Sequence, residues 1–468
     1  MTHPTGTADP IEALALGLAA VLPPAQIVRD PEAAASHAGD WSEVPHHTPP
    51  LVVYPRHPQQ VADVLRVCNA RGQPVTVQGG LTGLAGGATP QPGEIVLSLA
   101  RMQAIEDIDT VGGTALVQAG AVLDDLARRV EEAGWYFPLD LGARGSCQVG
   151  GNAATNAGGN RVIRFGTMRD LVLGLEVALP DGRLLTMLNR VTKNTTGVDL
   201  KHLFIGAEGT LGVITRLVLK LSPLPTALAT ALCALPSFDA ATRLLRDLRR
   251  GLSGLSAFEL MWSDYVEAAC EVSTLNPPFA GDHPVYVLIE TMGMDEETER
   301  DTMETRLGEA VEAGIVQDAI VAQSLDDAKS LWAYRESIGE LLGRLKPFAA
   351  FDVGIPVPAM DGFVSEVRQA LTERYPAGKH LFFGHIGDGN LHVLSGPHAD
   401  PVDLHDVEAA VYAATARAGG SISAEHGVGM VKRPFLPLSR SPAELEVMRS
   451  LKALFDPTGI LNAGRILS

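Results

Sequence analysis

Three glycine-rich clusters within the first 215 residues limit what this 468-residue chain can fold into more than any other feature. The first, Gln78 to Ala88, reads QGGLTGLAGGA, and the others span 142–160 and 206–215. Glycine takes positive φ readily and lets the backbone approach a ligand closely, so that successive N–H groups can line an anion site. One such cluster is equally well explained as an irregular turn. Three together favour a cradle for a cofactor.

The clusters do not follow the common nucleotide-binding motifs. Neither GxGxxG nor GxxxxGK[ST] occurs in the chain, which argues against a Rossmann site and against a P-loop. The second cluster mixes glycine with Ser146, Asn152, Thr155 and Asn156, whose side chains can bind a polar ligand. A nucleotide in this protein must therefore be held in another way.

Charge and composition exclude several classes of function. The 37 basic and 55 acidic residues give a net charge of −18, which disfavours binding to nucleic acid and to anionic membrane surfaces. The apolar run Ala13–Leu22 is shorter than the ~20 residues of a membrane span. The four cysteines show no CxxC spacing, so reduced thiols are expected. We predict a soluble, cytoplasmic protein without a membrane span.

Hydrophobic periodicity predicts an α+β chain. A helix is expected at 11–22, and 51–77 has a strand-helix-strand pattern. Further strands are expected at 95–99, 114–118, 172–179, 213–221, 284–291, 350–356 and 381–394, and further helices at 121–134, 200–205, 238–250, 297–313, 325–345, 401–418 and 441–455. The Ser-Pro-Leu-Pro sequence at 222–225 predicts a domain boundary, because glycine clusters become rare beyond it.

A second group of polar residues lies in the C-terminal half. His385 and His392 flank an Asp388-Gly389 turn, and a hairpin there would bring the two rings together. Downstream, Glu425 and His426 stand in a second glycine-rich motif. Two histidines and a carboxylate suit Zn²⁺ and also Mn²⁺, Fe²⁺ or Co²⁺. Single histidines in strands are more often structural, so the residues alone leave both interpretations open.

These motifs, in this order, resemble a known family. The runs at 78–88, 150–159 and 206–212 resemble the FAD-binding domain of the vanillyl-alcohol oxidase/p-cresol methylhydroxylase superfamily. The later motifs resemble those of the flavin-linked D-2-hydroxy acid dehydrogenases, which include D-2-hydroxyglutarate and D-lactate dehydrogenases. The resemblance covers residues from about 11 to 466. It implies an α+β fold with a two-subdomain FAD-binding domain at 1–222, a substrate (cap) domain on an antiparallel sheet at 223–418, and a C-terminal segment, 419–468, that completes the active site and packs on the FAD domain.

The same resemblance implies which residues bind FAD. The pyrophosphate would be held by Gln78, Gly79, Gly80, Leu81, Thr82, Gly83, Gly86 and Gly87. The ribityl chain and ring would contact Ser146, Gly151, Asn152, Asn156 and Gly159, and the adenosine part Glu208, Gly209 and Ile214. Relatives with the same Gly-Ser-Cys-Gln sequence around Cys147 hold FAD without a covalent bond, so we predict non-covalent FAD.

The resemblance also assigns the metal and the reaction. His385, His392 and Glu425 would bind a divalent metal, zinc first, with manganese, cobalt or iron as alternatives, and His426 would act as the base. By default, Asp388 and Asn390 are assigned to the turn, and a minor role in supporting the metal ligands is the alternative. The expected reaction oxidises a D-2-hydroxy acid to the 2-oxo acid, with hydride passing to FAD N5 and electrons to an unidentified acceptor such as an electron-transfer flavoprotein or a quinone.

Two interpretations from other classes compete with this one. A metallohydrolase would explain the His/Glu group but would leave three glycine clusters without a role. A non-catalytic binding protein would keep the flavin fold without turnover. A small 2-hydroxy acid is the expected ligand, and a homodimer is the expected assembly.

The substrate tail is where the chain departs from its hydroxyglutarate-type relatives. Arg335 matches a family arginine that binds a substrate carboxylate. Three further polar partners of the distal carboxylate are replaced, by Gly339, Ala350 and Leu394, and Lys346 would compensate only partly from the same helix face. We therefore predict a smaller or less polar tail, as in D-lactate or D-2-hydroxybutyrate. D-2-hydroxyglutarate itself is the alternative.

Overall fold

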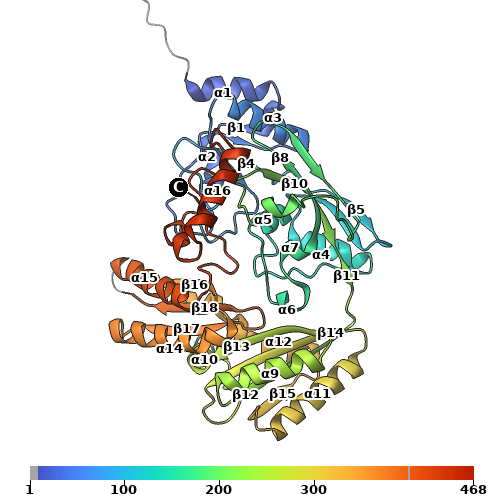
Figure 1. Ribbon diagram of the computed structural model, residues 1–468, viewed down its shortest axis with the longest axis vertical. Coiled ribbons are helices and arrows are strands. Elements are labelled where there is room, and N and C mark those ends of the chain that lie inside the picture. The colour runs from blue at the N-terminus through green and yellow to red at the C-terminus, as the bar shows by residue number, and fades with distance from the viewer. Residues whose placement is uncertain (1–8, 399–400, 468) are drawn as a thin grey trace, which may run out of the picture. The chain divides into compact units, whose positions relative to one another are not determined.

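The computed structural model describes residues 9–398 and 401–467, and the chain divides into two compact units (Figure 1). The first unit contains the described residues up to Gly158, the segment Thr167–Leu224 and the described residues from Glu425 onward. The second unit contains Gly159–Gly166 and the described residues from Pro225 to Ala424. Each unit has its own sheets and is described separately.

Two sheets form the first unit. The four-stranded sheet has the order β1 (Ile27–Val28), β2 (Val52–Val53), β4 (Ile95–Ser98), β3 (Val75–Gln78), with β2, β4 and β3 parallel. The five-stranded sheet is antiparallel, in the order β5 (Ile105–Asp109), β6 (Thr114–Gln118), β10 (Val213–Lys220), β8 (Val172–Ala178), β9 (Leu184–Met187). A short ribbon joins β7 (Trp135–Tyr136) to β11 (Ser222–Pro223).

The helices of the first unit other than α2 pack against one apolar core that both sheets share, and α2 packs through Ala34 on Val52 and Val96. Helix α3 shows why the pattern folds in this way: Pro58 starts it, and its apolar face at Val61, Val64, Leu65 and Cys68 is fully buried. The helices are α1 (Pro10–Ala19), α2 (Pro31–Ala34), α3 (Pro58–Asn69), α4 (Leu123–Glu132), α5 (Val149–Ala154), α7 (Met168–Leu171), α8 (Lys201–Phe204) and α16 (Pro442–Phe455), with 3₁₀ turns η1 (Pro24–Gln26), η2 (Ala35–His37) and η3 (Arg433–Leu438).

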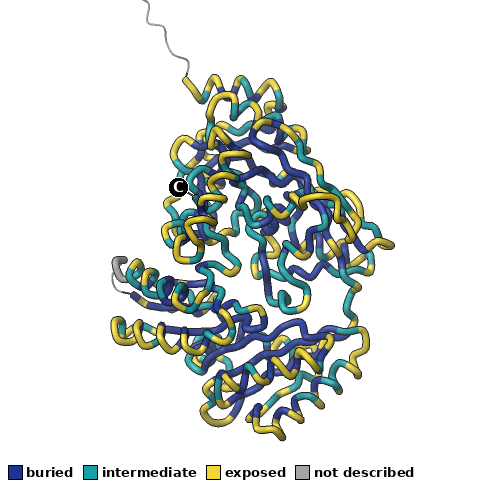
Figure 2. The backbone as a smooth tube through the Cα atoms, in the orientation of Figure 1, coloured by how far each residue is buried: buried dark blue, intermediate teal, exposed yellow. Residues whose placement is uncertain are grey.

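The second unit is built on one antiparallel seven-stranded sheet. Its order is β15 (Asp318–Val321), β12 (Ala227–Leu235), β14 (Val285–Gly293), β13 (Leu255–Trp262), β17 (Lys379–His385), β18 (Asn390–Gly396), β16 (Ala349–Gly354). The helices are α6 (Val162–Phe165), α9 (Phe238–Gly251), α10 (Ser263–Ser273), α11 (Glu296–Glu312), α12 (Leu325–Glu336), α13 (Ile338–Arg344), α14 (Val357–Arg374) and α15 (Pro401–Arg417). Figure 2 shows the central strands of this sheet as buried, in agreement with the fully buried run of β13.

Helices cover both faces of the seven-stranded sheet. On one face, α10, α12 and α13 enclose an apolar cluster with Met261, Leu288, Phe383 and Leu394 of the strands. On the other face, Phe238 of α9 stacks on Trp262 with ring centroids 5.9 Å apart. Because residues two apart on a strand share a face, the side of β17 that carries Phe383 also carries His385.

The structure forms most of the helices and strands that the sequence predicts, with two informative differences. The helix expected at 325–345 is two helices, because Ser337 ends α12 and starts α13. Among the longer elements, the strands β12 and β13 and the helices α10 and α14 were not predicted. Among the residues the structure describes, no helix is long and apolar enough to cross a membrane. The four cysteines form no disulfide.

Three buried polar side chains meet on the other face of the sheet, away from Phe383. His380 Nδ1 lies 2.9 Å from Ser395 Oγ, which lies 2.9 Å from His398 Nε2. His380 Nε2 lies 3.2 Å from the carbonyl oxygen of Tyr375, so this nitrogen is the donor and Nδ1 accepts from the serine hydroxyl. Burial lowers the pKa of His380, opposed in part by the hydrogen bond to Tyr375. The folded protein therefore keeps His380 neutral.

This burial predicts a loss of stability in mild acid. Below about pH 6.5, the usual pKa of histidine, the unfolded chain binds a proton at His380 that the folded chain does not, so the free energy of unfolding falls. We expect the Tm of the wild type to fall from pH 7.5 to 5.5 more steeply than that of His380→Gln. The exposed His57→Gln serves as the control and should keep the wild-type slope. A Tm difference between wild type and His380→Gln that is independent of pH would contradict the prediction.

Candidate functional site

A tight hairpin brings the two histidines of the HIGDGNLH motif together. Strand β17 ends at His385 and β18 begins at Asn390, and Gly389 in the turn has φ +85°. This left-handed conformation favours glycine. Phe383 pairs with His392 across the strands, and the rings of His385 and His392 lie edge to face with centroids 5.4 Å apart. The hairpin expected at Asp388-Gly389 is therefore present.

Glu425 joins these two histidines. One ligand atom from each of His385, His392 and Glu425 lies within 4.8 Å of the others. Glu425 directly follows Ala424, whose backbone N–H donates to Asp352 Oδ1 at 3.1 Å, and Asp352 faces His392 in the strand register. The carboxylate of Asp352 therefore fixes the chain immediately before Glu425. Three donors at this spacing fit a divalent metal ion.

A fourth residue, Glu259, orients the first histidine. Glu259 lies on β13 opposite His385 and is 0% exposed. Its Oε1 lies 2.6 Å from His385 Nδ1, which makes Nδ1 the protonated nitrogen and leaves Nε2 as the nitrogen with the lone pair. Sequence reasoning missed Glu259. The available signal was a single carboxylate inside the otherwise apolar run LSAFELMW.

Arg335 is the second partner of Glu259. Its Nε donates to Glu259 Oε2 at 2.8 Å, and its Nη2 lies 3.4 Å from His385 Nε2. The guanidinium also lies over the ring of Phe383, 4.7 Å from the centroid, and is only 5% exposed in this setting. Burial alone would raise the pKa of Glu259, but the charges and hydrogen bonds of His385 and Arg335 outweigh it and lower the pKa. Arg335 thus lies beside His385.

Helix α12 is anchored to the sheet by two carboxylates on neighbouring strands. Trp332 Nε1 donates to Glu290 Oε2 at 3.3 Å, three residues before the Arg335 contact with Glu259. Glu290 also accepts from Arg161 Nε at 3.1 Å and from Ser256 Oγ at 3.2 Å. Residues three apart share a helix face, so α12 presents both groups to the strands.

Of the three residues predicted to replace a polar tail pocket, Leu394 is buried among apolar side chains, whereas Gly339 and Ala350 are exposed. Ala350 of β16 pairs directly with Leu394 of β18, on the face that carries His392. Leu394 is buried in the apolar cluster with Phe383 and Leu345. The expectation that Lys346 shares a helix face with Arg335 is wrong. The two residues stand on either side of the break at Ser337, and Leu345 caps the end of α13.

Polar side chains, one of them from the cluster itself, fix the backbone of the first glycine cluster. Gln78 is buried, with Oε1 2.6 Å from His37 Nδ1, and its Nε2 donates to the carbonyl oxygen of Ala88 at 2.8 Å. The carboxylate of Asp40 accepts from the backbone N–H of Ala88 at 3.1 Å. A Cβ at Gly80 would overlap the carbonyl oxygen of Ser146 in the second cluster. The first and second clusters therefore lie against each other.

The second cluster contains helix α5 and has two buried amide oxygens without a hydrogen-bond partner among the described residues. Gln148 Oε1 and Asn152 Oδ1 have no hydrogen-bond partner among the described residues. Buried polar groups normally have one, so these atoms fit a polar cofactor such as FAD. Asn156 instead accepts from Arg169 N at 2.9 Å. Of the other predicted FAD residues, Gly159 belongs to the second unit, and Ile214 of β10 lies in the apolar core of the first.

The third cluster binds a distant segment of the first unit. The Glu208 carboxylate accepts from the backbone N–H groups of Val428, at 2.7 Å, and Gly429, at 2.8 Å. Burial raises the pKa of Glu208, and these two hydrogen bonds and the charge of Lys432 oppose it. The neighbouring Gly209 has φ +72°. Glu208 therefore fixes the chain just after Glu425 and His426, a contact that sequence reasoning missed.

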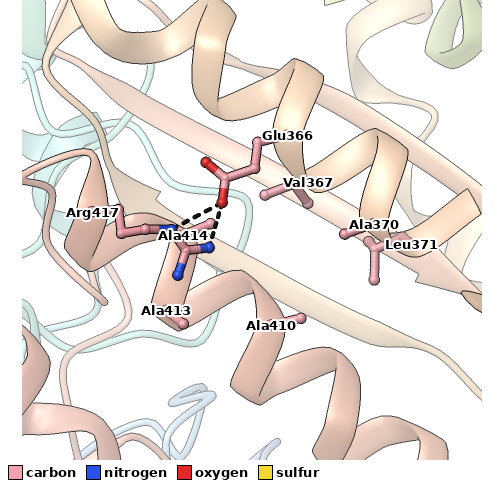
Figure 3. A pocket seen from close by; sticks show the side chains of 8 residues that line it. All are labelled: Glu366, Val367, Ala370, Leu371, Ala410, Ala413, Ala414 and Arg417. Atoms are coloured by element: carbon pink, nitrogen blue, oxygen red, sulfur yellow. Dashed lines mark hydrogen bonds and ion pairs between the residues drawn. The ribbon is translucent and has the colours of Figure 1, made fainter. Parts of the chain in front are cut away.

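A hollow on the second unit is separate from these groups. It lies between α14 and α15, and Figure 3 shows its lining of small apolar side chains around the ion pair of Glu366 and Arg417. Arg417 Nε donates to Glu366 Oε1 at 3.0 Å. Because its one carboxylate is already paired, the hollow lacks the chemistry of the His/Glu group.

Comparisons with known proteins cover most of the chain. The family model described as "FAD binding domain" matches residues 49–188, and "FAD linked oxidases, C-terminal domain" matches 224–466. Mitochondrial D-2-hydroxyglutarate dehydrogenase from Bos taurus is 41% identical over 447 residues, covering 95% of this chain and 81% of the relative. D-2-hydroxyglutarate dehydrogenase from Xanthomonas citri pv. viticola is 38% identical, covering 96% of both chains.

Solved structures confirm the predicted fold. p-Cresol methylhydroxylase with substrate bound matches with a TM-score of 0.78 at 14% identity, covering 97% of this chain and 96% of that one. 4-Ethylphenol oxidase from Gulosibacter chungangensis matches with a TM-score of 0.75 at 19% identity, covering 99% and 98%. The fold and the family matches define an FAD-dependent oxidoreductase. The chain belongs to the FAD-linked D-2-hydroxy acid dehydrogenases, and it shares the fold of p-cresol methylhydroxylase.

The Glu208 contact predicts a local loss of order when the carboxylate is removed. In Glu208→Ala the N–H groups of Val428 and Gly429 lose their acceptors, so we expect peptide 425–431 to exchange its amide hydrogens at least about 10-fold faster. Hydrogen exchange followed by mass spectrometry measures this directly. Glu176→Ala, which removes another buried carboxylate of the same unit, is the matched control. Equal exchange of this peptide in both variants would contradict the prediction.

Proposed function

We propose that this protein oxidises a D-2-hydroxy acid to the 2-oxo acid, using FAD and a divalent metal ion held by His385, His392 and Glu425. The observation that carries the proposal is the convergence of these three donors within 4.8 Å, with His385 oriented by a buried carboxylate. A metal-ligating histidine that donates its other N–H to a carboxylate is the usual arrangement in metal sites. Zinc is the first choice, with manganese, cobalt and iron as alternatives.

The residues have distinct parts in this reaction. When bound, FAD accepts two electrons, and the metal lowers the pKa of a hydroxyl group attached to it. His426, the residue after Glu425, accepts the hydroxyl proton of the substrate on a ring nitrogen. Arg335, fixed by Glu259, brings a positive charge next to His385 and attracts the substrate carboxylate. The electron acceptor, the homodimer and the cytoplasmic location stay predictions.

Non-covalent FAD is part of the proposal. The Cys147 thiol is the side chain in the second cluster that resembles a covalent attachment site. Burial raises its pKa, and a hydrogen bond from the Asn152 side chain opposes this only in part. A buried, protonated thiol is a weak nucleophile, which supports dissociable FAD.

The metal assignment predicts that substrate oxidation can be lost while FAD stays bound. Chelator treatment, His385→Ala, His392→Ala or Glu425→Ala should abolish substrate oxidation and retain the visible flavin spectrum. Glu259→Gln should weaken Zn²⁺ binding about 10- to 100-fold, because Nδ1 of His385 loses its carboxylate. His426→Ala should keep the metal, measured by elemental analysis, and lose turnover. A chelated enzyme that turns over normally would rule out the metal, and near-normal turnover of His426→Ala across pH would rule out the base.

The apolar surroundings of Leu394 favour a substrate with a small or apolar tail. A distal carboxylate placed beside Leu394 would be buried with too few donors. An anaerobic flavin-bleaching screen over D- and L-2-hydroxy acids tests the function. Among D-lactate, D-2-hydroxybutyrate, D-malate and D-2-hydroxyglutarate, we expect the highest kcat/KM with D-lactate or D-2-hydroxybutyrate. A hundredfold preference for the dicarboxylates, lost in Arg335→Ala, would favour D-2-hydroxyglutarate, the substrate in the relatives' names.

A further inference from the structure

Asn390 carries a buried side-chain amide that forms no hydrogen bond with the described residues. It is the first residue of β18 and is 4% exposed. Neither its Nδ2 nor its Oδ1 has a hydrogen-bond partner among the described residues. A buried amide without a hydrogen-bond partner is unfavourable, so native proteins rarely contain one away from a ligand site.

The turn does not require this side chain. The backbone N–H of Asn390 donates to Asp388 Oδ1 at 3.1 Å, and the backbone N–H of Asp388 donates to the carbonyl oxygen of His385 at 3.1 Å. These bonds use the Asn390 backbone and the Asp388 carboxylate. The assignment of Asn390 to the turn therefore leaves its amide group unexplained.

The strand register places this amide beside both histidines. Asn390 and His392 are two residues apart on β18, so their side chains share a face. His392 pairs with Phe383, and the hairpin continues from that pair to His385 at the end of β17 and Asn390 at the start of β18. The Asn390 amide thus lies next to His385 on the neighbouring strand and next to His392 on its own strand.

We propose that Asn390 positions the substrate by donating a hydrogen bond from Nδ2 to the carboxylate of the 2-hydroxy acid. This inference rests on the proposed function. A 2-hydroxy acid that chelates a metal uses its hydroxyl oxygen and one carboxylate oxygen, and its second carboxylate oxygen needs a donor. Of the neighbouring groups, the Glu259 carboxylate is an acceptor, and Arg335, which it holds through Nε, attracts the same substrate carboxylate by its charge. The Asn390 amide supplies a second, neutral donor.

The test separates a binding role from a structural one. Asn390→Leu keeps the side-chain shape and removes the unpaired polar atoms, so its Tm should equal or exceed that of the wild type. Its affinity for oxalate, a non-oxidisable chelating carboxylate, should fall about 10- to 100-fold by calorimetry on the FAD- and Zn²⁺-loaded protein. The KM of the best 2-hydroxy acid should rise by a similar factor, with kcat changed less.

Ser395→Ala is the matched control on the same strand. Ser395 is buried on the other face, between His380 and His398, so its loss should lower the Tm and leave oxalate binding unchanged. If Asn390→Leu fails to fold, Asn390→Ala takes its place, with the same expected fall in oxalate affinity and rise in KM. Unchanged oxalate affinity and KM in a folded Asn390 variant, with or without a lower Tm, would overturn the inference. A wild type whose flavin no 2-hydroxy acid reduces would overturn the proposed function and the inference with it, whereas the unchanged values in a folded Asn390 variant would overturn the inference alone.

Discussion

The site of the second unit depends on one buried charge, the carboxylate of Glu259. An unpaired carboxylate inside an apolar sheet costs several kcal/mol, so this residue is tolerated only with His385 and Arg335 as partners. Those two contacts fix the tautomer of the first histidine and hold α12 on the sheet. A single strand position therefore determines both the orientation of His385 in the His/Glu group and the location of the positive charge beside it.

The glycine clusters show a second constraint, which is the packing of loops on loops. Side chains at Gly80 or Gly150 would meet Ser146 or Ala119 of the same unit, and one at Gly429 would meet the backbone of Ala85. The sequence alone suggests that these glycines serve the cofactor. The structure shows that a share of them serve close backbone approach. Such packing allows the carboxylate of Glu208 to reach the backbone at 428–429.

Local patterns predicted most of the helices and strands and the hairpin, because these depend on periodicity and on turn residues close in the chain. The break at Ser337 was not predictable in this way, since a hydrogen bond from Ser273, 64 residues away, accompanies it. Glu259 was missed for the same reason: its partners come from β17 and α12, and only tertiary structure brings them together. Family resemblance located the His/Glu group without its supporting residues.

Buried carboxylates and buried neutral amides differ in their hydrogen-bond partners in this protein. The buried carboxylates of Glu259, Glu208, Glu176 and Glu94 all have partners from the chain itself. Neutral amides at Gln148, Asn152 and Asn390 are left with atoms unpaired. The difference follows from free energy, because an unpaired amide costs about 1–3 kcal/mol and an unpaired buried charge far more. A neutral amide at a binding site can therefore lack a hydrogen-bond partner in the ligand-free protein. A buried carboxylate needs partners from the chain itself in that state.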